Sequence, residues 1–335
     1  MGTVSNSGAI HTYSTTGNGI RNAGTFYNYG ILFPYSNSQA GISNSNYMYN
    51  SGSIYAYSNS GGGIRNSQTF INNDGTIESY GNVDGGVVNT SGFYNRGCLK
   101  TYSNSGGGVR NNGSFESSGT LYSYGNYDYT DGYGNLERGV GLTNRSGATM
   151  QLNGYTKIGY AGYLSPDNFA LSSNTGNAIK NAGELICGGD VRIGAGCVDS
   201  HAIHNTGKYY MSNTYVTCFG NRVGAGIYNE GYIYAVSSGI YGTAVHGLYN
   251  VSYNNNQWSG EINGNIQNGI YNTGDINMEN GTIQNTGRGV SNSGIFSMGS
   301  GTIQNTGTGL YNTGTFYMSG GVIQNSKTHG VEQNG

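Results

Sequence analysis

Residues 301–325 read GTIQNTGTGLYNTGTFYMSGGVIQN, a stretch in which the string Gly-x-Ile-Gln-Asn occurs twice, 20 residues apart. Three related strings, NMENGTIQN, SMGSGTIQN and YMSGGVIQN, carry methionines with the same spacing, at Met278, Met298 and Met318. A fixed period of this length indicates a repeat architecture, in which each unit buries its apolar face against its neighbours. We therefore expect a stacked, repetitive fold in this part of the chain.

A shorter signature extends the repeat through the whole chain: a small residue, an aliphatic residue, any residue, then Asn. Fourteen copies occur between TVSN at 3–6 and GLYN at 309–312, mostly 20–24 residues apart, with exceptions of 16, 33 and 37. A stacked carboxamide can donate a hydrogen bond to the coil above it and accept one from the coil below, which satisfies a polar group that points inward. We therefore predict an asparagine ladder of Asn6, Asn22, Asn44, Asn66, Asn89, Asn111, Asn144, Asn181, Asn205, Asn229, Asn250, Asn272, Asn292 and Asn312.

A tyrosine column supports the same register in the first third of the chain. The pattern Gly-x-[Ile/Leu]-x-x-Tyr recurs six times, and its tyrosines are 22 or 23 residues apart. They are Tyr13, Tyr35, Tyr57, Tyr80, Tyr102 and Tyr124. Two independent columns therefore agree on the length of one coil.

Short apolar bursts separated by Gly and Asn fit a β-solenoid, because these residues supply the positive φ angles of tight corners. In the coil that begins at Gly19, we expect Ile20, Phe26 and Leu32 to point inward. A helical repeat is disfavoured, since each Gly costs a helix about 1 kcal/mol. The sequence predicts an all-β, single-stranded parallel β-solenoid (β-helix) of about 14 coils of 20–24 residues, and the crossover preference favours a right-handed one.

Three zones follow along the chain without a linker between them. Residues 1–126 are predicted to form regular coils, 127–225 irregular coils with loop insertions in the same solenoid, and 226–335 regular coils again. With 14 basic and 16 acidic residues scattered over the chain, nucleic-acid binding is not expected. No apolar run is long enough to insert into a membrane as a helix.

The strings GTFYMSGGVIQN (314–325) and GTIQNTGTGLYNTGTF (301–316) resemble the repeats of bacterial parallel β-helix surface proteins, adhesins among them. The resemblance is plain over 226–330 and weaker over 1–126. It implies the fold more than any activity. The low charge and the bias toward Asn, Gly, Ser and Tyr favour an extracellular or cell-surface location. Because the start MGTVSNSGAIHTY carries no signal peptide, we expect a mature or non-classically exported form.

Carboxylates and arginines come close together in only two regions of the sequence. One region holds Asp128, Asp131, Glu137 and Arg138, and the other holds Asp190, Arg192 and Asp199. Neither group stacks into a column, so solubilising charges on loops are the favoured interpretation, and a polysaccharide lyase or hydrolase is a minor alternative. We expect a protein that is not an enzyme and that needs no cofactor.

The cysteines leave several possibilities open. Cys197 and Cys218 are 21 residues apart, about one coil, which would allow a disulfide between adjacent rungs. Buried free thiols are nevertheless the favoured interpretation. A zinc site with His201 and His204 is a further one, although its spacing fits no usual ligand pattern. The string GGDVRIGAG (188–196) matches calcium-binding repeats too poorly to predict a calcium site.

The residue that follows the aliphatic position of the signature should face outward, because neighbours on a strand alternate. In the last third this column is mostly tyrosine: Tyr228, Tyr249, Tyr271 and Tyr311. Such a strip could stack on sugars or on a partner filament. Stabilisation of neighbouring rungs by aromatic ladders is the favoured interpretation.

The outermost coils decide the predicted function. Unpaired strand edges at the ends of a solenoid invite pairing with another copy, and a head-to-tail contact of this kind produces open filaments. The predicted assembly interface consists of Thr3, Val4, Asn6, Ile10, Val322, Ile323 and Val331. The other interpretation of these ends is that the chain is part of a longer protein.

The sequence therefore predicts a non-enzymatic structural subunit that stacks head-to-tail into an extracellular or surface filament, with itself as partner. The alternative is an adhesin or viral tail-fibre-like module that binds glycans through the 127–175 insertions, with Tyr160 and Tyr163 as contact residues, and through the tyrosine strip.

Overall fold

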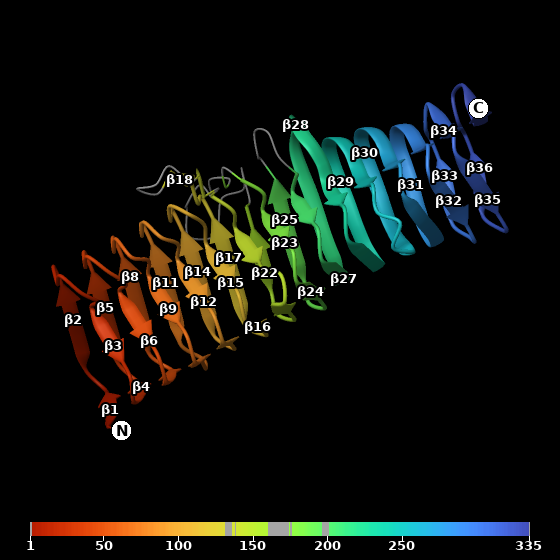
Figure 1. Cartoon of the computed structure of the whole chain (residues 1–335). Coiled ribbons are helices and arrows are strands. Elements are labelled where there is room, and N and C mark those ends of the chain that lie inside the picture. The colour runs from red at the N-terminus through yellow and green to blue at the C-terminus, as the bar shows by residue number, and fades with distance from the viewer. Residues whose placement is uncertain are drawn as a thin grey trace.

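The computed structural model describes residues 2–130, 136–137, 139–159, 174, 176–195 and 201–334. These residues form an all-β parallel solenoid of about 13 turns with no helix, which confirms the predicted fold class and comes close to the predicted number of coils. Figure 1 shows a rod whose two ends carry the N- and C-termini. The chain therefore advances along one axis, turn after turn.

Each turn contributes one strand to each of three sheet faces. The first face holds the strands of the Asn signature: β3 (Ile20–Asn22), β6 (Ile42–Asn44), β9 (Ile64–Asn66), β12 (Val87–Asn89), β15 (Val109–Asn111), β20 (Leu142–Asn144), β23 (Ile179–Asn181), β26 (Ile203–Asn205), β34 (Thr308–Asn312) and β37 (His329–Gln333). The second face holds β1 (Thr3–Asn6), β4 (Thr25–Asn28), β7 (Tyr47–Asn50), β10 (Thr69–Asn72), β13 (Gly92–Asn95), β16 (Ser114–Ser117), β21 (Thr149–Leu152), β24 (Glu184–Cys187), β27 (Lys208–Ser212), β32 (Ile295–Met298) and β35 (Thr315–Met318).

The third face holds β2 (Ala9–Tyr13), β5 (Ile31–Tyr35), β8 (Ser53–Tyr57), β11 (Thr76–Tyr80), β14 (Cys98–Tyr102), β17 (Thr120–Tyr124), β22 (Thr156–Ile158), β25 (Val191–Ala195), β33 (Thr302–Gln304) and β36 (Val322–Gln324). Four long strands run around the corners: β28 (Thr214–Asn229), β29 (Tyr232–Asn250), β30 (Asn256–Asn272) and β31 (Asp275–Asn292). A short antiparallel pair, β18 (Tyr129–Thr130) with β19 (Leu136–Glu137), stands apart from the solenoid sheets.

The core is built from columns of like residues. Alternate residues of each strand point inward, so the parallel register places aliphatic or aromatic side chains of successive coils on top of one another. Ile20, Phe26 and Leu32 are buried, as predicted. Phe70, Phe93 and Phe115 stack with ring centroids 4.8 and 5.4 Å apart. Each of these columns continues the hydrophobic core from one coil to the next.

One corner of the rod is lined by a glycine column that we call the corner-glycine column: Gly8, Gly30, Gly52, Gly75, Gly97, Gly119, Gly154 and Gly189. A Cβ atom on Gly30 would lie 2.0 Å from the carbonyl oxygen of Gly8, and one on Gly52 would lie 2.0 Å from that of Gly30. Only glycine lets the backbones of successive coils approach this closely. The spacing of these glycines is therefore a packing requirement.

Asparagines form a continuous ladder along the inside of the first face. From Asn22 to Asn312, the Nδ2 of each asparagine donates to the Oδ1 of its counterpart in the next coil at 2.7–2.9 Å. The last of them, Asn312, donates to Oε1 of Gln333 at 2.6 Å. The ladder crosses both irregular intervals directly, from Asn111 to Asn144 and from Asn144 to Asn181. Each irregular interval is therefore a single long coil.

Asn6 does not belong to this ladder, so the sequence assignment of that residue was wrong. Strand β1 pairs with β4 on the second face, and Nδ2 of Asn6 donates to Oδ1 of Asn28 at 2.8 Å. This second ladder continues through Asn50, Asn72, Asn95 and Ser117. TVSN matched the signature because strands of both faces end in an inward Asn, at which the chain turns.

A third ladder, which the sequence analysis did not identify, follows the third face. It joins Asn37, Asn59, Asn82, Asn104, Asn126 and Asn174 at 2.9–3.3 Å. Each of the three corners is therefore held by stacked amides in the first part of the rod. The regular 22- or 23-residue spacing from Asn37 to Asn126 was the available signal, whereas Asn174 follows only after 48 residues.

Candidate functional site

The predicted assembly residues lie at the two ends of the rod. At the N-terminal end, Thr3 and Val4 are exposed, Val4 to 49%, although its equivalents Phe26 and Met48 are buried. At the C-terminal end, Val322 and Val331 are 47% and 50% exposed. Asn6 is buried, whereas Ile10 and Ile323 are partly buried against the core. Both end coils therefore leave apolar surface exposed to solvent.

The third face carries two aromatic columns side by side. The six tyrosines from Tyr13 to Tyr124 stack with centroids 4.8–5.3 Å apart and ring planes within 15° of parallel. In the adjacent column His11, Phe33 and Tyr55 stack at 4.5 and 5.2 Å. Offset or parallel rings in successive coils attract one another, so these columns add to rung-to-rung stability.

The tyrosine strip of the first face is continuous with a cluster of histidines. His201 stacks on Tyr228 at 4.6 Å, and His246 stacks on Tyr271 at 4.8 Å. Glu230 accepts a bond from the Tyr228 hydroxyl at 2.9 Å. Burial and the nearby Glu230 raise the pKa of Tyr228 to about 12. The rings of this strip therefore pack on one another and on imidazoles.

We expect acid to weaken the fold through His201 and His246. Burial lowers the pKa of each to about 4, while an unfolded histidine titrates near 6.5. Between these values the unfolded chain binds more protons than the native one, so stability falls as the pH falls from about 6.5 to 4. In urea titrations, the pH-dependent loss should be about 1–2 kcal/mol smaller in a His201→Gln/His246→Gln variant, allowing for solvent screening. Parallel pH profiles would contradict this assignment.

The described members of the two acidic clusters of the sequence make local contacts. Oδ1 of Asp128 accepts the Gly139 backbone N–H at 2.9 Å, and Glu137 lies in β19. Asp190 and Arg192 form a bidentate pair with two bonds of 3.1 Å. Asp131, Arg138 and Asp199 lie outside the described residues, as do Tyr160 and Tyr163.

The predicted disulfide stays a prediction, because Cys197 lies outside the described residues. Cys218 is buried and pairs in register with Ala195. Cys98 and Cys187 carry free thiols. Within the part of the chain that the structure describes, no group of three or more His, Cys, Asp or Glu side chains is placed to hold a metal ion.

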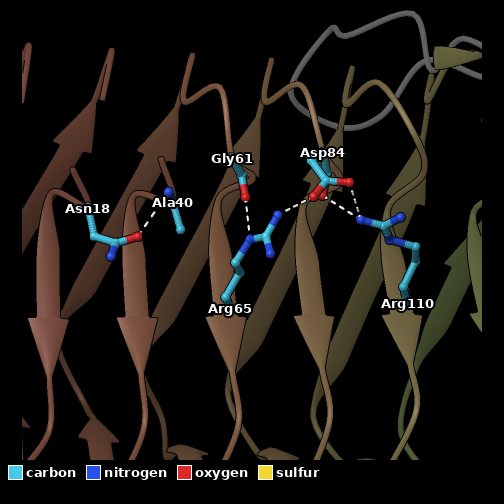
Figure 2. Close-up of polar contacts among 6 residues, drawn as sticks. All are labelled: Asn18, Ala40, Gly61, Arg65, Asp84 and Arg110. Atoms are coloured by element: carbon cyan, nitrogen blue, oxygen red, sulfur yellow. Dashed lines mark hydrogen bonds and ion pairs between the residues drawn. The ribbon is translucent and has the colours of Figure 1, made fainter. Parts of the chain in front are cut away.

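An ion-pair chain at the edge of the first face joins two arginines of the outward column to Asp84, which the sequence did not single out. Figure 2 shows Asp84 between Arg65 of β9 and Arg110 of β15, with a carboxylate oxygen paired to each guanidinium. Arg110 also donates to the carbonyl oxygen of Asp84 at 2.8 Å. The outward column of this face therefore accommodates charge pairs that span coils.

A groove of about 480 Å³ lies on the third face of the C-terminal half, beside Tyr215, Tyr241, Glu261 and Gln284. Glu261 accepts bonds from the Tyr241 hydroxyl at 2.8 Å, from Gln284 at 2.9 Å and from Asn263 at 3.0 Å. Partial burial raises the pKa of Glu261, but these three bonds outweigh it and hold the pKa below its usual value. The Glu261 carboxylate is thus held in place by three donors where it lines the groove.

Comparison of the chain with protein-family models, with curated proteins and with solved structures gives no match. A search of the described residues for a helix long and apolar enough to cross a membrane also gives none. The chain is a β-solenoid repeat protein.

Proposed function

We propose that this protein is a structural subunit that stacks head-to-tail, through its two end coils, into an extracellular or cell-surface filament. The observation that carries the proposal is the order of the strands at the two ends. The first three strands, β1, β2 and β3, lie on the second, third and first faces, and the last three, β35, β36 and β37, lie on the same faces in the same order. A second copy can therefore continue all three sheets at once.

The exposed residues of the end coils support this arrangement. In the interior of the rod, the positions equivalent to Val4 and Val331 are buried by the next coil. Covering such side chains gains about 25 cal/mol for each Å² of apolar surface removed from water. The terminal strands also offer backbone N–H and C=O groups to a new neighbour, which favours strand addition. The contact is heterologous, so it leads to an open filament.

The corner-glycine column offers a variant that separates assembly from folding. In Gly30 and Gly52, an added Cβ would meet the carbonyl of the preceding coil, whereas a Cβ on Gly8 has nothing within 4 Å. In a stacked pair of copies, the space beside Gly8 would be filled by the last coil of the neighbour. Gly8→Ala should therefore leave the isolated chain intact and obstruct stacking.

The test is negative-stain electron microscopy with light scattering on wild type, Gly8→Ala and Val4→Asp. We expect the wild type to form fibres with an axial repeat of about 60–70 Å. Both variants should remain short rods with an unchanged circular-dichroism spectrum, and Gly8→Ala should keep the wild-type melting temperature. A wild type that stays monomeric at high concentration would rule the proposal out.

Glycan binding, as in an adhesin or a viral tail fibre, is the second candidate function. The groove at Glu261 favours it, because tyrosine rings beside a fixed carboxylate and amides suit the apolar faces and hydroxyl groups of sugars. Short monodisperse rods in the microscope would make a glycan array the next measurement.

A further inference from the structure

We infer that the junction between two stacked copies is fixed in polarity and register by the first face, where Glu332 of one copy pairs with Arg21 of the next and Gln333 pairs with Asn22. The inference rests on the proposed filament and specifies its interface. Its partner is a second copy of this chain.

The columns of the first face place these residues opposite one another. Strand β3 begins its three columns with Ile20, Arg21 and Asn22, which pair with the equivalent residues of β6. At the other end, β37 closes the same columns with Val331, Glu332 and Gln333, paired with β34. Continued stacking therefore sets an apolar residue on an apolar one, an acid on a base, and an amide on an amide.

The asparagine ladder gives the junction its direction. Every Nδ2 donates toward the C-terminal end of the rod, and Gln333 accepts the last of these bonds through its Oε1. Its Nε2 is thereby turned toward the following coil, where Oδ1 of Asn22 would accept. In the described chain that oxygen accepts only the Gly24 backbone N–H, at 3.1 Å. If two N-terminal ends or two C-terminal ends met instead, the terminal amides would place acceptor against acceptor or donor against donor.

The charges at the junction are complementary. The Arg21 side chain is exposed, and Glu332 keeps local contacts with Asn334 at 2.9 Å and with His329 at 3.6 Å. Arg65 and Arg110 occupy the same outward position as Arg21 in their own strands, and both pair with a carboxylate in a neighbouring coil (Figure 2). The face therefore already accommodates the type of pair that the junction requires.

On the second and third faces, the junction would stack residues of unlike size and polarity. The same kinds of unlike pair occur between coils inside the rod. On the second face, Met318 would stack on Asn6, and inside the rod Ser117 pairs with Leu152. On the third face, Ile323 would stack on Thr12, and inside the rod Ser123 pairs with Ile158. Columns that pass between polar and apolar residues are therefore compatible with continuous stacking.

The experiment is a charge swap, read as the critical concentration for fibre formation in a sedimentation assay. Arg21→Glu and Glu332→Arg should each raise it at least about tenfold, because like charges then face each other. The double variant should return close to the wild-type value. Arg96→Glu is the matched control: Arg96 is exposed at a corner of the rod away from both ends and should change nothing. High salt should reduce the difference between single and double variants.

The outcomes separate the two proposals. Fibres that form equally well from the single variants, or a double variant no better than either single one, overturn the first-face junction and leave the filament standing. A wild type that never forms fibres overturns both. Slower fibre growth in Gly330→Ala would support the junction independently. In one copy a Cβ atom on Gly330 has nothing within 4 Å. A Cβ atom on the equivalent Gly309 would lie 2.4 Å from the carbonyl oxygen of Gly330 in the next coil.

Discussion

Replacing Asn111 by Asp should lower the free energy of unfolding by about 3–5 kcal/mol. Asn111 is fully buried, and its Nδ2 donates to Oδ1 of Asn144 at 2.9 Å, to the Thr149 carbonyl at 2.8 Å and to the Gly113 carbonyl at 3.0 Å. A carboxylate has no hydrogen to donate, so one of its oxygens would face three acceptor oxygens without water between them.

Asn112→Asp is the matched control, because the next residue along the chain is exposed. It should change stability by less than about 0.5 kcal/mol. Urea denaturation followed by circular dichroism measures both variants. Because a protonated carboxyl regains one donor, the buried variant should recover part of its stability toward about pH 4. Equal losses in the two variants would show that the ladder amide contributes little.

Gly52→Ala should cost about 3 kcal/mol or more. The new methyl group would lie 2.0 Å from the Gly30 carbonyl oxygen and 2.8 Å from the carbonyl carbon of Tyr29. Both obstacles are backbone atoms, so no rotamer change relieves the clash. The backbone of Gly30 cannot shift away from the new methyl group, because it packs just as closely against the coil of Gly8.

Thermal and urea unfolding of Gly52→Ala beside Gly8→Ala test this expectation within one column. The two substitutions add the same methyl group at equivalent corners, and only the interior one has a coil against it. A Gly52→Ala variant as stable as Gly8→Ala would mean that the coils can separate locally at little cost. The predicted difference is large enough to move the urea midpoint clearly.

The sequence was sufficient for the fold because a solenoid repeats its environment. Any residue that must stack, such as Asn22 on Asn44 or Tyr13 on Tyr35, recurs at the coil length and becomes visible as a column. Assigning each column to a face was harder. TVSN at 3–6 has the pattern of the first face but lies on the second, and its interval of 16 residues was the sign that it belonged elsewhere.

The candidate sites were less predictable, since they depend on contacts outside the columns. Arg65 and Arg110 share one column, but their common partner Asp84 lies at a corner outside it, so the coil period does not reveal the ion pairs. Glu261 is held by donors from its own coil and from both neighbouring coils, where bulges shift the register by one residue or more. Periodicity cannot reveal such contacts, because they arise where the repeat is interrupted.

The uniform sense of the asparagine ladder has an electrical consequence. Every carboxamide from Asn22 to Asn312 points its amino group the same way, so the amide dipoles add along the rod. The short series from Gln324 through Gln304 to Gln284 runs in the opposite sense and subtracts only a small part. The asparagine ladder therefore contributes a permanent electric dipole along the rod axis, and this contribution grows with each coil.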